Sequence, residues 1–215
     1  MAGICAVCGA ASFGTVFVKG LWSMLLIPAL MIYGGLIERN LLTVKNVEIP
    51  SGKLPEAFDG YRIVHISDLH LRSFAGRSGA LKRAVEKINA LEPDLICFSG
   101  DLVTMASSEI EPFKDILSSL RAHDGVVSVM GNHDYCSYNP DRSLDKDEEA
   151  AKVKTTEREM GWNLLDDTNV RIERGGHHIS VAGVQNISAS REFQSYGDLA
   201  KAMAGADGEY RIPLC

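Results

Sequence analysis

Three short polar motifs hold the residues of this chain that are best suited to chemistry. They are Asp68-Leu69-His70, Gly100-Asp101 and Gly131-Asn132-His133-Asp134. Their carboxylate, imidazole and amide groups suit divalent metals of intermediate hardness, such as Mn²⁺, Fe²⁺ or Zn²⁺. Asp101 is the only acid in its motif, and a carboxylate can bridge two ions. If the motifs meet in space, they predict a two-metal site of the kind that clamps the attacking and leaving oxygens in phosphoester hydrolysis.

Each motif follows an apolar run that is typical of a buried strand. The runs cover residues 61–67, 94–99 and 125–130, and they are short and rich in β-branched residues. Helical patterns over 78–91 and 109–121 separate them. Alternating strands and helices of this length predict βαβ units and a parallel sheet, where ligands gather beyond the carboxyl ends of the strands. The pattern therefore predicts that the three motifs converge at one edge of the sheet.

In this order and at strand ends, the three motifs resemble those of the calcineurin-like metallophosphoesterase superfamily. The surrounding sequences, FDGYRIVHISDLHL and VVSVMGNHDY, are similar to its membrane-associated bacterial branch. The resemblance covers roughly residues 54–215. It implies an α/β fold, a β-sandwich with a βαβαβ core flanked by helices. It also implies a metal-dependent phosphoric ester hydrolase that cleaves a phosphomonoester, phosphodiester or pyrophosphate bond.

The resemblance implies two divalent metal ions, with manganese, iron and zinc as the candidates. Asp68 and His70 would hold the first ion, and Asp101 would bridge both. Asn132 would bind the second ion. The family pattern continues with two later motifs that supply three further histidines, and no histidine follows His178 here. We therefore expect a family member without its final strands. A truncated, catalytically impaired membrane-anchored module is the alternative function.

His133 and Asp134 are the candidate catalytic pair. By the resemblance, His133 would lie outside the metal shell, contact the phosphate and assist the leaving group. Asp134 would orient His133 by a hydrogen bond. The expected substrate is a phosphorylated small molecule or a lipid-linked compound. His177 and His178 are alternative metal ligands, although histidines beside a predicted hairpin turn are usually solvated.

The N-terminal part of the chain differs in composition from the rest. Residues 20–37 contain no charge, and a membrane span needs about 20 apolar residues. We predict a single-pass membrane anchor over 1–37, a connector over 38–54 and the phosphoesterase domain over 55–215. A signal peptide is the alternative, but no basic residue precedes Lys19. The positive-inside rule favours a cytoplasmic catalytic domain, because more basic residues follow the apolar stretch than precede it.

Charge and cysteine content limit the function classes. The chain has 215 residues, a net charge of −6 and no cluster of Lys and Arg. This argues against nucleic acid as a held partner, because such binding depends on neutralising phosphates. A phosphorylated substrate remains compatible, since bound metals supply positive charge locally. The five cysteines are an odd number and form no complete disulfide framework.

The remaining segments show weaker local patterns. Alternating apolar residues predict a strand over 42–49, and Arg174-Gly175-Gly176 predicts a hairpin turn between strands over 169–173 and 178–184. A charged helix that ends near Met160 and a final helix over 193–204 complete the prediction.

Overall fold

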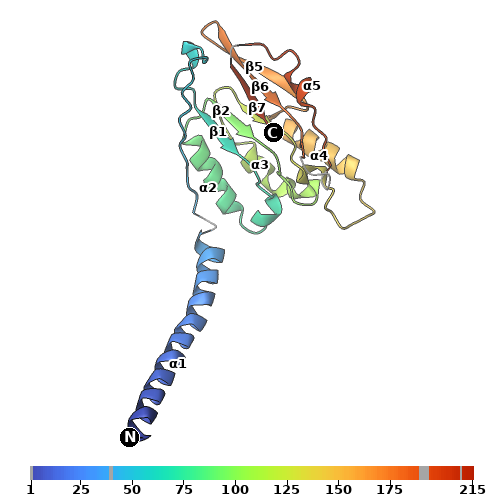
Figure 1. Ribbon diagram of the computed structural model, residues 1–215. Helices are drawn as coiled ribbons and strands as arrows, with labels where there is room; N and C mark the ends of the chain where they lie inside the picture. The colour runs from blue at the N-terminus through green and yellow to red at the C-terminus, as the bar shows by residue number, and fades with distance from the viewer. Residues whose placement is uncertain (1, 39–40, 189–193, 209) are drawn as a thin grey trace. The chain divides into compact units, whose positions relative to one another are not determined.

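In the computed structural model of the chain (Figure 1), four ranges of residues are described: 2–38, 41–188, 194–208 and 210–215. The chain divides into two compact units, Met1–Glu48 and Ile49–Cys215.

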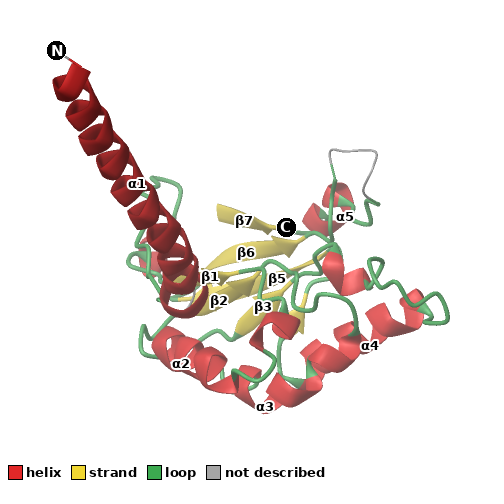
Figure 2. Cartoon of the chain, turned by 90° about the horizontal axis from the view of Figure 1, so that it is seen from below, coloured by secondary structure: helices red, strands yellow, loops and turns green. Residues whose placement is uncertain are grey.

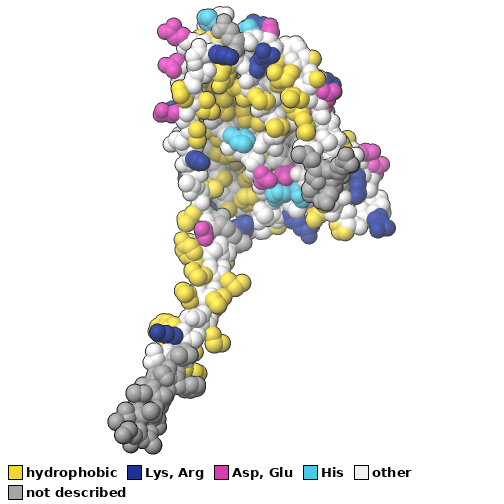
Figure 3. Space-filling model, in the orientation of Figure 1, with side chains coloured by type: hydrophobic (Ala, Val, Ile, Leu, Met, Phe, Trp, Pro, Cys, Tyr) yellow, Lys and Arg dark blue, Asp and Glu magenta, His cyan; other side chains and the backbone are white. Residues whose placement is uncertain are grey.

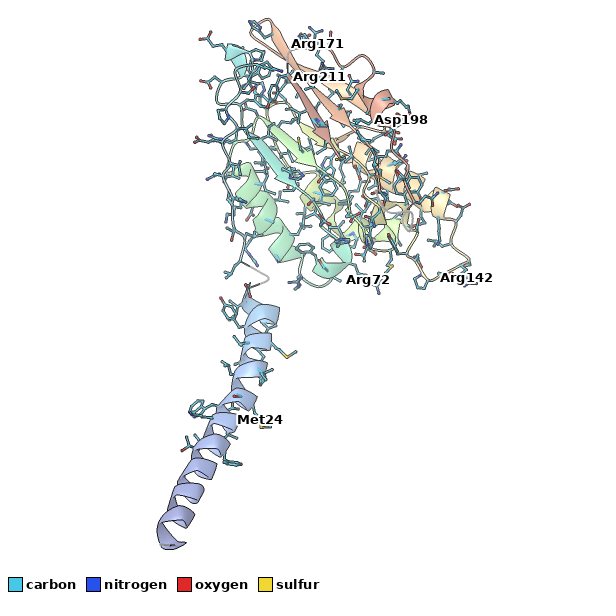
Figure 4. All side chains as sticks on the ribbon, viewed as in Figure 1. Met24, Arg72, Arg142, Arg171, Asp198 and Arg211 are labelled. Carbon is cyan, nitrogen blue, oxygen red and sulfur yellow. The ribbon has the colours of Figure 1, made fainter. Side chains whose placement is uncertain are left out.

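The first unit is dominated by one long helix. Helix α1 (Ala2–Ile32) continues into a π-helical turn, η1 (Tyr33–Ile37). Large apolar side chains such as Trp22 and Met24 are exposed along its described part (Figure 3, Figure 4). The stretch Phe17–Ile37 is long and apolar enough to cross a membrane. The predicted apolar helix is therefore present.

The predicted strand over 42–49 is wrong. Residues 41–50 have no regular secondary structure and are exposed to solvent. No strand pairs with this segment in the described part of the chain. A strand is stabilised by pairing with a neighbour, so an alternating pattern alone is not sufficient to form one.

The second unit contains the predicted parallel sheet. It has four strands in the order β1 (Ile63–Ile66), β2 (Leu95–Phe98), β3 (Val126–Ser128) and β4 (Asn163–Leu164). All three neighbouring pairs are parallel. Strands β2 and β3 are buried throughout, which explains why their sequences are apolar runs and do not alternate.

Helices cover one face of this sheet (Figure 2). They are α2 (Ser78–Asn89), α3 (Lys114–Leu117) and α4 (Lys146–Glu159). The helix predicted over 109–121 is replaced by two 3₁₀ turns, η5 (Ser107–Glu109) and η6 (Glu111–Phe113), and by the short α3. Ser118 and Ser119 donate their hydroxyls back to backbone carbonyls, which favours ending the helix.

A second sheet packs on the opposite face (Figure 2). Strands β5 (Thr168–Arg174) and β6 (His177–Gly183) form the predicted antiparallel hairpin, and β7 (Tyr210–Leu214) pairs parallel with β6. Gly175 and Gly176 both have positive φ, as a tight two-residue turn requires. Helix α5 (Leu199–Met203) is shorter than predicted, and residue 193 lies outside the described residues.

Apolar side chains from both sheets fill the space between them. They include Cys97 and Val127 from the parallel sheet and Ile179 and Val181 from β6. A separate cluster packs the helices against the other face, with Phe98 and Leu102 among its fully buried members. The central strands β2 and β3 are therefore packed on both faces, whereas, among the described residues, the edge strand β1 contributes none to the cluster between the sheets.

Candidate metal centre

The three motifs lie at the carboxyl ends of β1, β2 and β3, as predicted. The loops that carry the first two motifs run side by side. Asp68 N–H donates to the Gly100 carbonyl at 3.0 Å, and His70 N–H donates to the Asp101 carbonyl at 3.0 Å. These bonds extend the parallel ladder beyond the ends of the strands. The two motifs are consequently fixed to each other by backbone, and their side chains project from a shared support.

The backbone of three predicted metal ligands is strained. Asp68, His70 and Asp101 have φ values of 54°, 42° and 59°, in the left-handed region. This conformation costs roughly 1–2 kcal/mol for a residue with a Cβ atom. Strain of this kind concentrates at functional sites, where the surrounding structure enforces it. Its presence on two neighbouring loops supports a functional role for these side chains.

The side chains of the motifs converge around His70. Its Nε2 atom lies 3.8 Å from Asp68 Oδ1 and 3.8 Å from Asp101 Oδ2. One ligand atom each from His70, Asp101 and His133 lie within 4.8 Å of one another. The Asp68 side chain is 65% exposed, whereas that of Asp101 is 14% exposed. The cluster is thus open to solvent on the Asp68 side, and acidic and histidine side chains lie together on the visible face of the domain (Figure 3).

These residues fit a divalent cation. Two carboxylates approach His70 Nε2 at a distance too long for a hydrogen bond. The other ring nitrogen, Nδ1, is buried and has no hydrogen-bond partner among the described residues. A cation between the two carboxylates and Nε2 would satisfy these three groups, although not Nδ1. Nitrogen with carboxylate oxygen is the donor set that Mn²⁺, Fe²⁺ and Zn²⁺ accept.

Asn132 is the N-cap of the short 3₁₀ turn η7 (His133–Tyr135). Its Nδ2 atom donates to the Tyr138 hydroxyl at 3.0 Å. With the nitrogen turned to Tyr138, the amide oxygen, the atom that binds metals, is left for the centre. The Tyr138 ring also packs 4.5 Å from the His133 ring, between centroids. Sequence reasoning missed Tyr138, because it lies in a polar loop whose path no periodic pattern indicates.

His133 is held on two sides, by the Asp101 carboxylate and by the Thr104 carbonyl. Its N–H donates to Asp101 Oδ1 at 2.9 Å, which links the second and third motifs. Its ring Nδ1 lies 2.9 Å from the Thr104 carbonyl oxygen. A carbonyl can only accept, so Nδ1 carries the proton and the neutral ring has its lone pair on Nε2. The predicted hydrogen bond from Asp134 to this ring is therefore wrong.

Asp134 has a different role. It is fully buried, and its carboxylate accepts three backbone N–H groups, from Asp101 at 2.8 Å, Val103 at 3.1 Å and Gly131 at 2.9 Å. Burial raises the pKa of the Asp134 carboxyl to about 7, although all three of these hydrogen bonds lower it. Asp134 thus connects the loops of the second and third motifs from beneath the site.

The motif glycines are required by contacts between the loops. A Cβ atom on Gly131 would lie 2.5 Å from the Asp101 nitrogen and closer still to Asp101 Oδ1. A Cβ atom on Gly100 would overlap with the Gly131 nitrogen, and Gly100 has a φ of 93°. The motif glycines therefore permit the second and third motif loops to approach each other closely.

The alternative ligands His177 and His178 lie elsewhere. They begin β6, directly after the hairpin turn, and Arg174 before that turn contacts Asp94 at 2.8 Å. Asp94 precedes β2, so the turn lies at the amino ends of the parallel strands, opposite the motifs. His178 Nε2 lies 3.2 Å from Asp207 Oδ1. The structure does not bring either histidine to the centre.

Comparison with known proteins identifies the family. Residues 61–207 match the calcineurin-like phosphoesterase family. The chain belongs to this family. The matched region contains all three motifs and strands β1 to β6, and it ends before β7.

Three relatives illustrate the range of the family around this chain. "Transmembrane protein with metallophosphoesterase domain" is 29% identical in Danio rerio and 31% identical in Bos taurus, over 89% and 78% of this chain. "UDP-2,3-diacylglucosamine pyrophosphatase LpxG" of Chlamydia trachomatis is 42% identical over 47% of this chain. The aligned regions span 43%, 37% and 31% of these relatives' own lengths.

Proposed function

We propose that this chain hydrolyses a phosphoric ester or pyrophosphate bond at the three-motif centre. The observation that carries the proposal is the convergence of His70, Asp101 and His133 within 4.8 Å at the carboxyl edge of the parallel sheet. Divalent ions bound there would polarise phosphoryl oxygens and lower the pKa of water toward about 7. Membership of the calcineurin-like phosphoesterase family supports the same reaction class.

The residues of the chain divide between holding ions and moving a proton. Asp68 and His70 would hold one ion, and Asp101 would be shared with a second ion at Asn132. His133 has its Nδ1 proton engaged by the Thr104 carbonyl, so only Nε2 is available to the substrate. Once protonated, Nε2 can donate to the oxygen of the leaving group, which is general acid catalysis. Asp134 takes no direct part and holds the loops in place.

We propose a membrane-anchored chain that acts on a lipid-linked phosphate or pyrophosphate. The apolar stretch Phe17–Ile37 supports the anchor, and its relatives include proteins named as transmembrane. The name of the chlamydial relative, a diacylglucosamine pyrophosphatase, supports a lipid-linked substrate. Extraction of membranes with alkaline carbonate tests the anchor: the chain should stay in the pellet, and its release into the supernatant would contradict it.

The reaction is tested with the full chain in detergent micelles after treatment with a chelator. Mn²⁺ binding is measured by titration calorimetry, and hydrolysis is measured with bis(4-nitrophenyl) phosphate and 4-nitrophenyl phosphate. We expect Mn²⁺ to restore hydrolysis. Asp101→Asn should weaken Mn²⁺ binding at least about tenfold and reduce hydrolysis by roughly 10²-fold or more, since it removes the shared carboxylate.

Asp115→Asn is the matched control, because Asp115 is exposed in α3 and outside the motifs. It should behave like the unmodified chain. Hydrolysis that survives chelation, or an Asp101→Asn variant with normal Mn²⁺ affinity, would contradict the proposal. Tight binding of a single ion without measurable turnover would instead identify a metal-binding module of low activity.

A further inference from the structure

The Thr104 carbonyl, which accepts the His133 Nδ1 proton, belongs to a loop without regular structure. The loop joins Asp101 to the 3₁₀ turn η5 and contains the half-buried Thr104 and Met105. A carbonyl in an irregular loop can rotate unless something fixes its peptide plane. The orientation of the Thr104 carbonyl therefore depends on what holds the peptide unit between Thr104 and Met105.

Glu109 fixes it. One carboxylate oxygen, Oε1, accepts the Met105 N–H at 2.9 Å, and the other, Oε2, accepts the Thr104 N–H at 2.7 Å. The Thr104 carbonyl and the Met105 N–H belong to the same planar peptide unit and point in opposite directions. The carboxylate on one side and the His133 ring on the other therefore hold a single peptide plane between them.

Two further bonds strengthen this arrangement. Glu109 Oε2 also accepts the Arg72 N–H at 3.3 Å, which connects the loop to the segment directly after His70. Asn139 Nδ2 donates to the Met105 carbonyl at 3.1 Å and holds the next peptide unit. A charged acceptor on the Met105 N–H also polarises the peptide and makes the Thr104 carbonyl a better acceptor for the ring.

We propose that Glu109 is a positioning residue that selects the tautomer and orientation of His133 through the Thr104–Met105 peptide. The proposal rests on the proposed function where it concerns turnover, and it stands alone where it concerns the ring. Without Glu109, the peptide can rotate and the ring loses its fixed acceptor. The Nδ1 and Nε2 tautomers should then mix, and Nε2 should no longer be directed at the substrate.

The ring is tested directly in the metal-free full chain in detergent micelles, with ¹⁵N-labelled histidine. The nitrogen chemical shifts should show a single His133 tautomer protonated on Nδ1. Glu109→Ala should give a mixture of tautomers, and Glu109→Gln, which keeps one acceptor oxygen, should lie between. Glu111→Ala is the matched control, because Glu111 is exposed two residues further along. A folded Glu109→Ala chain with an unchanged single tautomer would overturn the proposal.

Turnover provides a second readout that a general loss of structure would not reproduce. 4-Nitrophenolate is a stable anion and leaves without being protonated. The more basic phenolate of a phenyl ester leaves more readily when a general acid protonates it. General acid catalysis contributes about 10²–10⁴-fold, so Glu109→Ala should reduce kcat about 10–100-fold for the phenyl ester and about twofold or less for the 4-nitrophenyl ester. In a His133→Ala background, Glu109→Ala should have almost no further effect.

Equal losses on both esters, or additive losses in the double variant, would show that Glu109 only stabilises the loop. If the unmodified chain hydrolyses neither ester, the proposed function fails, while the tautomer measurement still decides the role of Glu109.

Discussion

Replacing Asp134 by alanine should destabilise the domain by several kcal/mol. The carboxylate accepts three backbone N–H groups, of which that of Val103 is buried and those of Asp101 and Gly131 are half-buried. An unpaired buried donor costs about 1–3 kcal/mol, and a half-buried one costs less because water can reach it. Taking about 1 kcal/mol for each half-buried donor gives a total of roughly 3–5 kcal/mol. The total free energy of unfolding of a typical domain is only about 5–15 kcal/mol.

Asp134→Asn gives an internal comparison of magnitude. Its remaining oxygen can serve two donors, as Oδ2 does for Asp101 and Gly131, and its NH₂ group then faces the Val103 N–H. We expect a loss of about 1–3 kcal/mol, close to the cost of one unpaired donor. The assay is urea unfolding of the full chain in detergent micelles, followed by circular dichroism, with Asp115→Asn as the control.

The two possible roles of Asp134 give opposite results. If the carboxylate served mainly to orient His133, Asp134→Asn would unfold at the normal urea concentration and lose only turnover. If it connects the motif loops, stability and Mn²⁺ affinity should fall together. A single ordinary hydrogen bond contributes roughly 1 kcal/mol. The reasoning would be refuted if the free energy of unfolding of Asp134→Ala lay within about 1 kcal/mol of that of the unmodified chain.

Three other changes have defined outcomes. Gly131→Ala should lower the stability of the domain by about 1–3 kcal/mol, because its Cβ atom would overlap with Asp101. It should also abolish Mn²⁺ binding, as measured by calorimetry. Burial raises the pKa of Glu157 to about 8, so stability should fall as the pH rises from the ordinary carboxyl value of 4.5 toward 8. The Glu157→Gln side chain cannot ionise, so over this pH range the variant should become more stable than the unmodified chain by up to a few kcal/mol, as measured by urea unfolding. The same pH dependence of stability in both proteins would disprove the effect. Arg174→Ala should cost about 1 kcal/mol in thermal unfolding, and less at high salt, because its ion pair with Asp94 is partly exposed.

Segments whose structure depends on local pattern were predicted well. The runs before each motif became β1, β2 and β3, and β2 and β3 are buried because central parallel strands need apolar residues on both faces. The expected burial of the first run is wrong, since β1 is an edge strand whose residues are exposed or half-buried. The helix predicted over 78–91 is α2 (Ser78–Asn89), and the Gly175-Gly176 turn gave the hairpin its register. In each case the residues that decide the structure lie next to one another in the sequence.

Segments whose structure depends on distant partners were predicted poorly. The strand expected over 42–49 has suitable alternation but no pairing strand among the described residues. A second error of this kind concerns Asp134, which was predicted to bond to the His133 ring. Its three donors are backbone groups, and a backbone N–H is present at almost every residue.

The same reason explains why Thr104 and Glu109 were not predicted. Thr104 acts through its carbonyl, so its side chain gives no signal. Glu109 lies in a segment whose pattern suggested an ordinary helix, where a glutamate is typical of a solvated face. Only the path of the loop shows that both oxygens of its carboxylate face backbone N–H groups.

The backbone strain at the site shows how these unpredicted contacts and the predicted ligands depend on each other. Propensity alone would place glycine at positions with the φ values of Asp68, His70 and Asp101. Holding three such residues costs roughly 3–6 kcal/mol at about 1–2 kcal/mol each. The ligands must therefore be fixed by bonds that other conformations cannot form. The hydrogen bonds from Asp68 and His70 to the second motif, and those from the motif loops to Asp134, are bonds of this kind. The predicted ligands are thus kept in place by hydrogen bonds to backbone groups, and the sequence does not show which backbone groups these are.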